Sequence, residues 1–92
     1  MIGLKDAVTS AVAFARSVLE EDRVKDLLVE EVERSTQDDR DVWLITLSLP
    51  RPGFEMRPVF PTSVKDRDYK TFAIDALTGE VLSMKIRNVS FA

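Results

Sequence analysis

Alternation of side chains over residues 42–49 is the feature that most restricts the fold. Apolar side chains stand at every second position from Trp43 to Leu49, whereas the side chains between them become polar towards Thr46 and Ser48. This two-residue period, with its aromatic and β-branched content, is typical of a β-strand that buries one face. Such a strand needs neighbouring strands and a covering layer, which the rest of the chain must supply.

The N-terminal segment supplies a candidate covering layer, because residues 4–21 have the pattern of an amphipathic helix. Its alanines favour the helix and allow it to lie close to a sheet. No glycine ends the pattern, so its C-terminal boundary is soft. The apolar residues expected on the buried helical face are Leu4, Val8, Ala11, Val12, Ala15, Val18 and Leu19.

Residues 26–35 fit either a helix or a strand, and we favour a strand. The polar cluster at 35–41 then forms a turn into the strand at 42–49, so that the two strands make a hairpin. Val29 interrupts the alternation of the apolar residues around it, which suggests a β-bulge.

Residues 68–88 have the pattern of a second hairpin. A three-residue loop faces Ile74 with Leu82 and Phe72 with Met84, whereas a four-residue loop turns the opposite side of the last strand inward. We expect the three-residue loop because it buries more apolar surface. The last strand's side chains expected on the inner face are Leu82, Met84 and Ile86.

These elements predict a single α+β domain over residues 1–92, with one N-terminal helix packed on a four-stranded antiparallel sheet. The 92 residues include no cysteine and no histidine, which excludes disulfides, thiol nucleophiles, imidazole bases and sites built on these ligands. The net charge of −3 disfavours nucleic acid as a partner. No apolar stretch is long enough for a membrane span and no secretion signal is evident, so we expect a cytoplasmic protein. We also expect no cofactor.

The hairpin from Phe72 to Leu82 resembles the C-terminal hairpin of PepSY and PepSY-like domains. The matching residues are Phe72-Ala73-Ile74-Asp75-Ala76-Leu77-Thr78-Gly79-Glu80-Val81-Leu82. The strand Trp43-Leu44-Ile45-Thr46-Leu47 is similar to the middle strand of that family, and the alanine-rich helix stands where its first helix stands. The resemblance implies a cystatin-like fold and non-enzymatic work, including regulation or inhibition of a peptidase. At Asp75, Thr78 and Gly79 it implies turn geometry rather than a catalytic site.

All four prolines lie in a long segment, residues 50–67, which we interpret as an inserted loop. Its basic and large apolar residues suit either an acidic protein partner or packing back onto the sheet, with a nucleic acid strand as the weaker alternative. The candidate partner-binding residues are Arg51, Phe54, Met56, Arg57 and Phe60.

Two acidic clusters have alternative interpretations. The cluster Asp38, Asp39 and Asp41 lacks the spacing of a calcium loop, so we interpret it as a solvated turn. The cluster Glu30, Glu31 and Glu33 is interpreted as a solvated edge strand rather than as paired catalytic carboxylates. We therefore predict no catalytic residue and no metal site. Trp43 is expected to lie in the core and cover the helix.

The sequence thus indicates a small bacterial-type protein-interaction module that is not an enzyme. A partner strand added at a sheet edge, or contacts of the long loop, are the expected modes of binding. A structural homo-oligomer such as a dimer, and an immunity-type protein that binds a toxin, are the alternatives.

Overall fold

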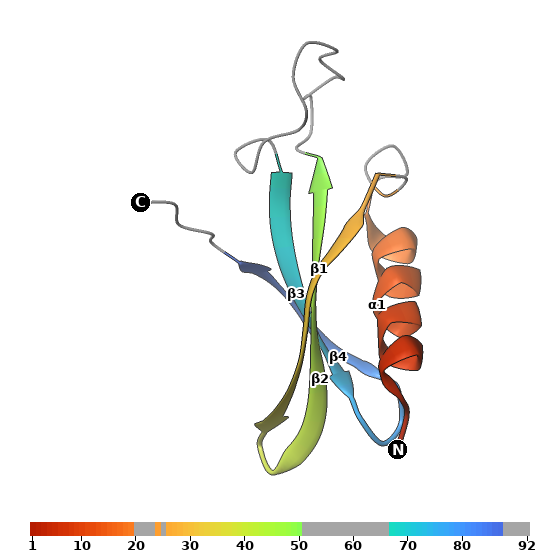
Figure 1. Cartoon of the computed structure of the whole chain (residues 1–92), viewed down its shortest axis with the longest axis vertical. Coiled ribbons are helices and arrows are strands. Elements are labelled where there is room, and N and C mark those ends of the chain that lie inside the picture. The colour runs from red at the N-terminus through yellow and green to blue at the C-terminus, as the bar shows by residue number, and fades with distance from the viewer. Residues whose placement is uncertain (20–23, 25, 51–66, 88–92) are drawn as a thin grey trace.

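The computed structural model describes residues 1–19, 24, 26–50 and 67–87. One helix, α1 (Leu4–Val18), precedes four strands, β1 (Leu28–Gln37), β2 (Arg40–Pro50), β3 (Arg67–Asp75) and β4 (Val81–Arg87). The strands form one antiparallel sheet in the order β1-β2-β3-β4, and α1 lies along one of its faces (Figure 1). The predicted α+β architecture is therefore confirmed.

The helix meets the sheet through a row of small side chains. Ala7, Ala11 and Ala15 are fully buried, at the four-residue spacing that places them on one helical face. Two residues expected on that face, Leu4 and Val18, are instead 46% and 51% exposed, because they lie at the two ends of the helix. The helix also ends at Val18, before the predicted boundary at residue 21.

The β1–β2 hairpin confirms that residues 26–35 contribute a strand and that the strand contains a bulge. Val29 pairs with Leu47 and Glu31 pairs with Thr46, so Glu30 is the extra residue. The turn is tighter than predicted, because the two strands extend into the polar cluster and leave only Asp38 and Asp39 between them. Both have positive φ, 48° and 63°, as two-residue turns of the type I′ class require.

The β3–β4 register agrees only in part with the prediction. Phe72 pairs with Met84 as expected, but Ile74 pairs with Val81 rather than with Leu82. A register shift between Ala73 and Ile74 absorbs the difference, so that Val81 and Met84 both pack against the core. Ile86 shares the parity of Met84 but is 77% exposed.

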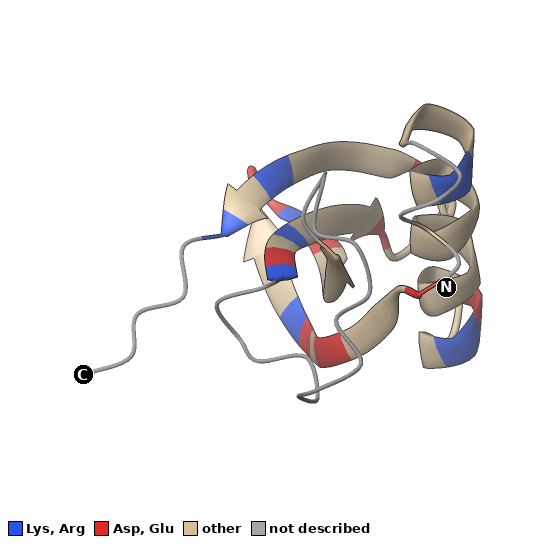
Figure 2. Ribbon diagram, turned by 90° about the horizontal axis from the view of Figure 1, so that it is seen from above, with Lys and Arg blue, Asp and Glu red and all other residues tan. Residues whose placement is uncertain are grey.

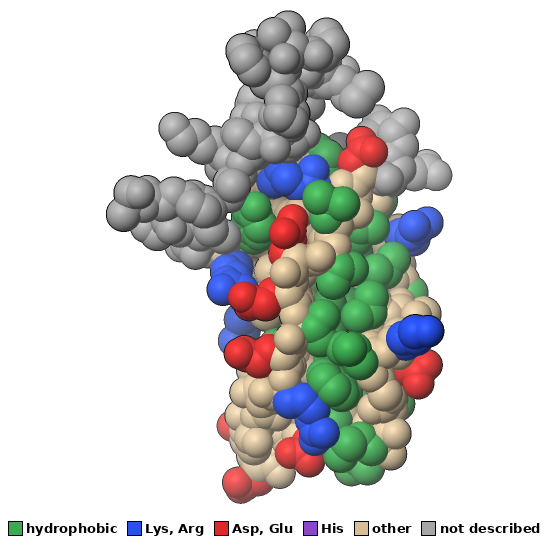
Figure 3. Space-filling view, in the orientation of Figure 1, with side chains coloured by type: hydrophobic (Ala, Val, Ile, Leu, Met, Phe, Trp, Pro, Cys, Tyr) green, Lys and Arg blue, Asp and Glu red, His purple; other side chains and the backbone are tan. Residues whose placement is uncertain are grey.

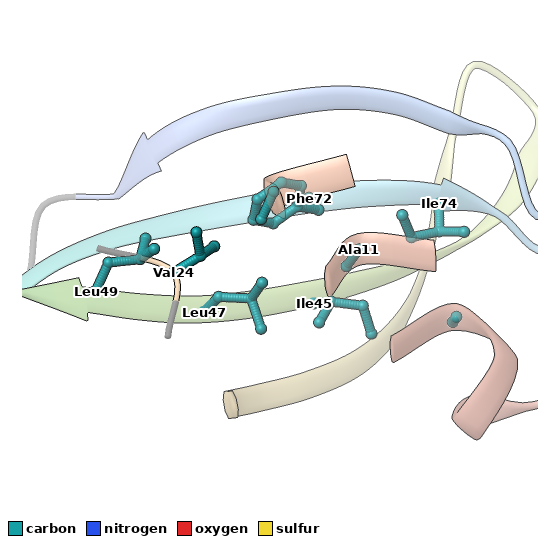
Figure 4. Close-up of a cluster of buried hydrophobic side chains, with 9 residues drawn as sticks. Ala11, Val24, Ile45, Leu47, Leu49, Phe72 and Ile74 are labelled. Carbon is teal, nitrogen blue, oxygen red and sulfur yellow. The ribbon is translucent and has the colours of Figure 1, made fainter. Parts of the chain in front are cut away.

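The core lies between α1 and the middle of the sheet (Figure 4). The Phe14 and Phe72 rings meet edge to face with their centroids 6.2 Å apart. Fully buried side chains come mainly from β2 and β3, and the largest on the helix-facing side are Phe72, Ile45, Leu47, Leu49 and Ile74.

Trp43 packs against this core as expected, although its side chain is only partly buried. Its indole Nε1–H donates to the main-chain oxygen of Ile2 at 3.3 Å. The Ile2 N–H in turn donates to the oxygen of Ala76 at 2.7 Å, so the segment before α1 is fixed to the β3–β4 turn.

The β3–β4 turn has the geometry that the Asp-x-x-Thr-Gly pattern predicts. Asp75 Oδ1 accepts hydrogen bonds from the N–H groups of Leu77 at 2.8 Å and Thr78 at 3.2 Å. Gly79 follows with a φ of 81°, in the left-handed region that favours glycine. These residues therefore form the turn, as the sequence indicated.

Candidate functional site

The residues predicted to bind a partner lie outside the part of the chain that the structure describes. They are Arg51, Phe54, Met56, Arg57 and Phe60. Among the described residues, the candidate binding surface is the edge strand β1.

β1 is an edge strand that the helix leaves uncovered. Within the described ranges it pairs only with β2, and α1 packs chiefly over β2, β3 and β4. Ser10 and Ile2 lie beside Gly79 in the β3–β4 turn, which places this flank of the helix towards β4. The opposite flank, with Val8 and Val12, therefore faces the side of β1.

Apolar side chains gather where β1 lies beside α1 (Figure 3). Val29 on β1 is 48% exposed and pairs with Leu47, on the helix-facing side of the sheet. Val32 shares that side and, like Val8 and Val12 on the near flank of α1, is partly buried and packs against the core. We call these four residues the β1 apolar strip. An exposed apolar strip beside an open strand edge is a surface suited to binding another protein chain.

A polar network fixes the bulged end of β1. Ser48 Oγ donates to Glu30 Oε2 at 2.7 Å and accepts from Arg67 Nε at 2.8 Å. Arg67 Nη2 donates to the main-chain oxygens of Ser48 at 2.9 Å and of Asp26 at 2.7 Å. Since Arg67 is only 8% exposed, these bonds hold a buried cation and tie the start of β1 to β2 and β3.

An ion pair crosses the helix-free face of the sheet. Arg87 Nη1, near the end of β4, donates to Glu31 Oε1 on β1 and to Thr46 Oγ1, the latter at 3.2 Å. In a flat sheet three strand spacings would separate β1 from β4 by about 14 Å, so the sheet is curled towards this face. The hydrogen bond that Arg87 donates to Glu31, with the nearby charges of Glu31 and Glu33, raises the pKa of Arg87.

The two outer strands carry opposite charge. β1 holds three glutamates and one arginine, a net of −2, whereas β4 holds Lys85 and Arg87, a net of +2. Figure 2 shows the basic residues of β4 close to where that strand ends. The side chains of Lys85, Ile86 and Arg87 are all exposed. Like charges on one edge strand oppose pairing of that edge with its own copy.

The described carboxylates have structural partners or face solvent. Asp75 pairs with Arg40 at 3.2 Å, and Asp41 lies 3.8 Å from Arg34. The N–H of Leu77, then that of Thr78, lowers the pKa of Asp75, and the Arg40 charge adds to the effect. Within residues 1–19, 24, 26–50 and 67–87, no group of three potential ligands is arranged to hold a metal ion.

No family model matches this sequence, and no curated protein or solved structure is significantly similar to it. Among the residues that the structure describes, no helix is long and apolar enough to cross a bilayer.

No sequence pattern indicated the β1 apolar strip directly, because the exposure of the strip depends on where the helix lies over the sheet. Val29, which breaks the alternation of β1, was the one available indication. The bulge at Glu30 turns Val29 to the same side as Val32. The Arg67 network and the Arg87–Glu31 pair join residues 19 and 56 positions apart, which no local pattern predicts.

Proposed function

We propose that this protein is a non-enzymatic interaction module that binds a partner by adding a strand of that partner to β1. The observation that carries the proposal is the β1 apolar strip, half-exposed next to an edge strand whose outward side has no neighbour in the described part of the chain. Strand addition supplies affinity through main-chain hydrogen bonds, and alternate side chains supply specificity.

The rigidity of the edge supports the same proposal. The Arg67 network holds the first residues of β1 in place, so little conformational entropy is lost when a partner strand binds. The resemblance to PepSY domains supports an enzyme as the bound protein, with peptidases as the first class to assay.

The function is tested with Val29→Lys, which places a charge in the β1 apolar strip at a half-exposed position. Leu77→Lys is the matched control, since Leu77 is 71% exposed and lies in the turn at the far side of the sheet. Partners captured from a lysate should be lost with Val29→Lys and kept with Leu77→Lys. Amide exchange should slow along β1 when the captured partner is bound. Capture that is equal for both variants contradicts binding at β1.

A further inference from the structure

We propose that a second copy of this chain binds at β1, through the open edge of its β4, so that the sheet of one molecule continues into the sheet of the next. This rests on the proposed function, because it names the partner of the same edge.

Charge selects this pairing over the symmetrical ones. Arg87 and Glu31 pair within one chain, which leaves β1 a net −1 from Glu30, Glu33 and Arg34 and β4 a net +1 from Lys85. These charges attract, whereas β1 against β1 places glutamates together and β4 against β4 places cations together. The contact is therefore heterologous, with different surfaces of the two copies meeting.

The order of residues on the two strands fits one antiparallel register. With Glu33 opposite Lys85 of the second copy, Val32 falls opposite Ile86 and Glu31 falls opposite Arg87. Glu31 pairs with Thr46, Thr46 with Thr71, and Thr71 with Lys85, so Glu31, Glu33, Lys85 and Arg87 share the helix-free face. The same alternation places Val32 and Ile86 on the helix-facing side. Glu33 then meets Lys85 of the second copy, and Glu31 meets its Arg87 in addition to the Arg87 that it binds within its own chain. Val32 meets Ile86.

This register also covers side chains that the single chain leaves in solvent. Ile86, the most exposed large apolar residue of the described strands at 77%, would lie against Val32 and the β1 apolar strip. The neighbouring copy's Ile86 thus lies along the outer edge of β1, on the same face as the β1 apolar strip.

The first test measures the mass of the full chain by sedimentation at rising concentration. We expect association at low ionic strength. It should weaken at 0.5 M salt, where the Debye screening length is on the order of a few ångströms and exposed charge pairs attract less. Glu33→Lys and Lys85→Glu should each weaken association about tenfold. Neither substitution removes the Arg87–Glu31 pair. A full chain that stays monomeric at about 1 mM and low salt overturns the inference.

Mixing the two variants decides between this contact and any other self-association. The reversed charge at position 33 of Glu33→Lys complements the reversed charge at position 85 of Lys85→Glu, so the mixture should associate more strongly than either variant alone. Because the chain has no cysteine, Glu33→Cys mixed with Lys85→Cys should give one mixed disulfide under mild oxidation. If the mixture does not associate and the mixed disulfide does not form, the register and the pairing are overturned.

The two proposals fail separately. If Val29→Lys abolishes capture of a different protein while the wild-type chain stays monomeric, the β1 edge binds partners and the second copy is not one of them. If Val29→Lys changes neither capture nor association, the proposed function fails as well.

Discussion

The indole N–H of Trp43 donates a hydrogen bond to the main-chain oxygen of Ile2, with 3.3 Å between Nε1 and the oxygen. This bond joins β2 to the short segment before the helix. On the other side of Ile2, its N–H reaches Ala76 in the β3–β4 turn. This attachment ties the N-terminal end of α1 to β2 and to the β3–β4 turn, on the side of the sheet away from β1.

Replacing Trp43 should therefore lower stability by more than its partial burial suggests. We expect Trp43→Phe to cost about 1 kcal/mol, since the ring remains but the hydrogen bond is lost. Trp43→Ala should cost about 2–3 kcal/mol, because packing against the core is lost too. Urea denaturation measures both, with the 71% exposed Leu77→Ala as a near-neutral control. Equal losses for the phenylalanine and alanine variants would contradict this account.

The two glycines that the structure describes should respond differently to alanine. Gly79→Ala should cost about 1 kcal/mol, because a φ of 81° is unfavourable for a residue with a Cβ atom. The added Cβ meets no atom closer than 3.6 Å, so the cost comes from the backbone and not from a clash. Gly3→Ala is the matched control, with φ −87° and open space around the added carbon, and should change stability by less than about 0.5 kcal/mol. Gly79→Asn should be milder than Gly79→Ala, and the reverse order would contradict the left-handed turn.

How far the sequence determines this fold is clear from particular residues. The alternation around Trp43 and the helical spacing of the alanines predicted the elements and their faces, because both periods follow from local backbone geometry. The Asp75–Gly79 turn was predictable for the same reason. The side chain that follows the turn was not, since a bulge at β3–β4 replaced Leu82 by Val81 opposite Ile74.

The candidate site was less predictable, because it depends on what the helix fails to cover. The number of strands under α1 is set by packing of Ala7, Ala11 and Ala15 against the sheet, and no local pattern specifies that position. The expected partner-binding residues of the 50–67 segment lie outside the described residues and stay a prediction.

Asp75 should make stability depend on pH in the acid range. Its pKa is lowered in the folded protein, chiefly by the hydrogen bond from the Leu77 N–H, from an ordinary value of 3.8. A lowered pKa means that the folded state binds fewer protons than the unfolded state, so stability rises with pH through this range. The contribution is fully present above about pH 5 and is lost as the pH falls through the folded-state pKa. In Asp75→Asn the urea midpoint should lie below that of the wild type at pH 7, and the two should converge towards pH 2. A constant difference across this range would show that the carboxylate charge has no part in the turn.

Arg67 should be the most sensitive polar side chain of the described strands. It is 8% exposed and donates three hydrogen bonds that join the start of β1 to β2 and β3. Arg67→Met should cost about 2–4 kcal/mol, because the Ser48 and Asp26 main-chain oxygens lose their donor in a buried setting. Arg67→Lys should recover part of the loss, since a single ammonium group cannot reproduce the planar fork of donors.

Amide exchange in Arg67→Met should accelerate first at the bulged end of β1, near Glu30, and least in the β3–β4 turn. Arg34→Met is the control. The exposed Arg34 guanidinium lies 5.2 Å from the centre of the Trp43 ring, so its loss should cost only about 0.5 kcal/mol. If exchange instead rises uniformly along the sheet, Arg67 supports the whole fold and does not specifically hold the β1 edge.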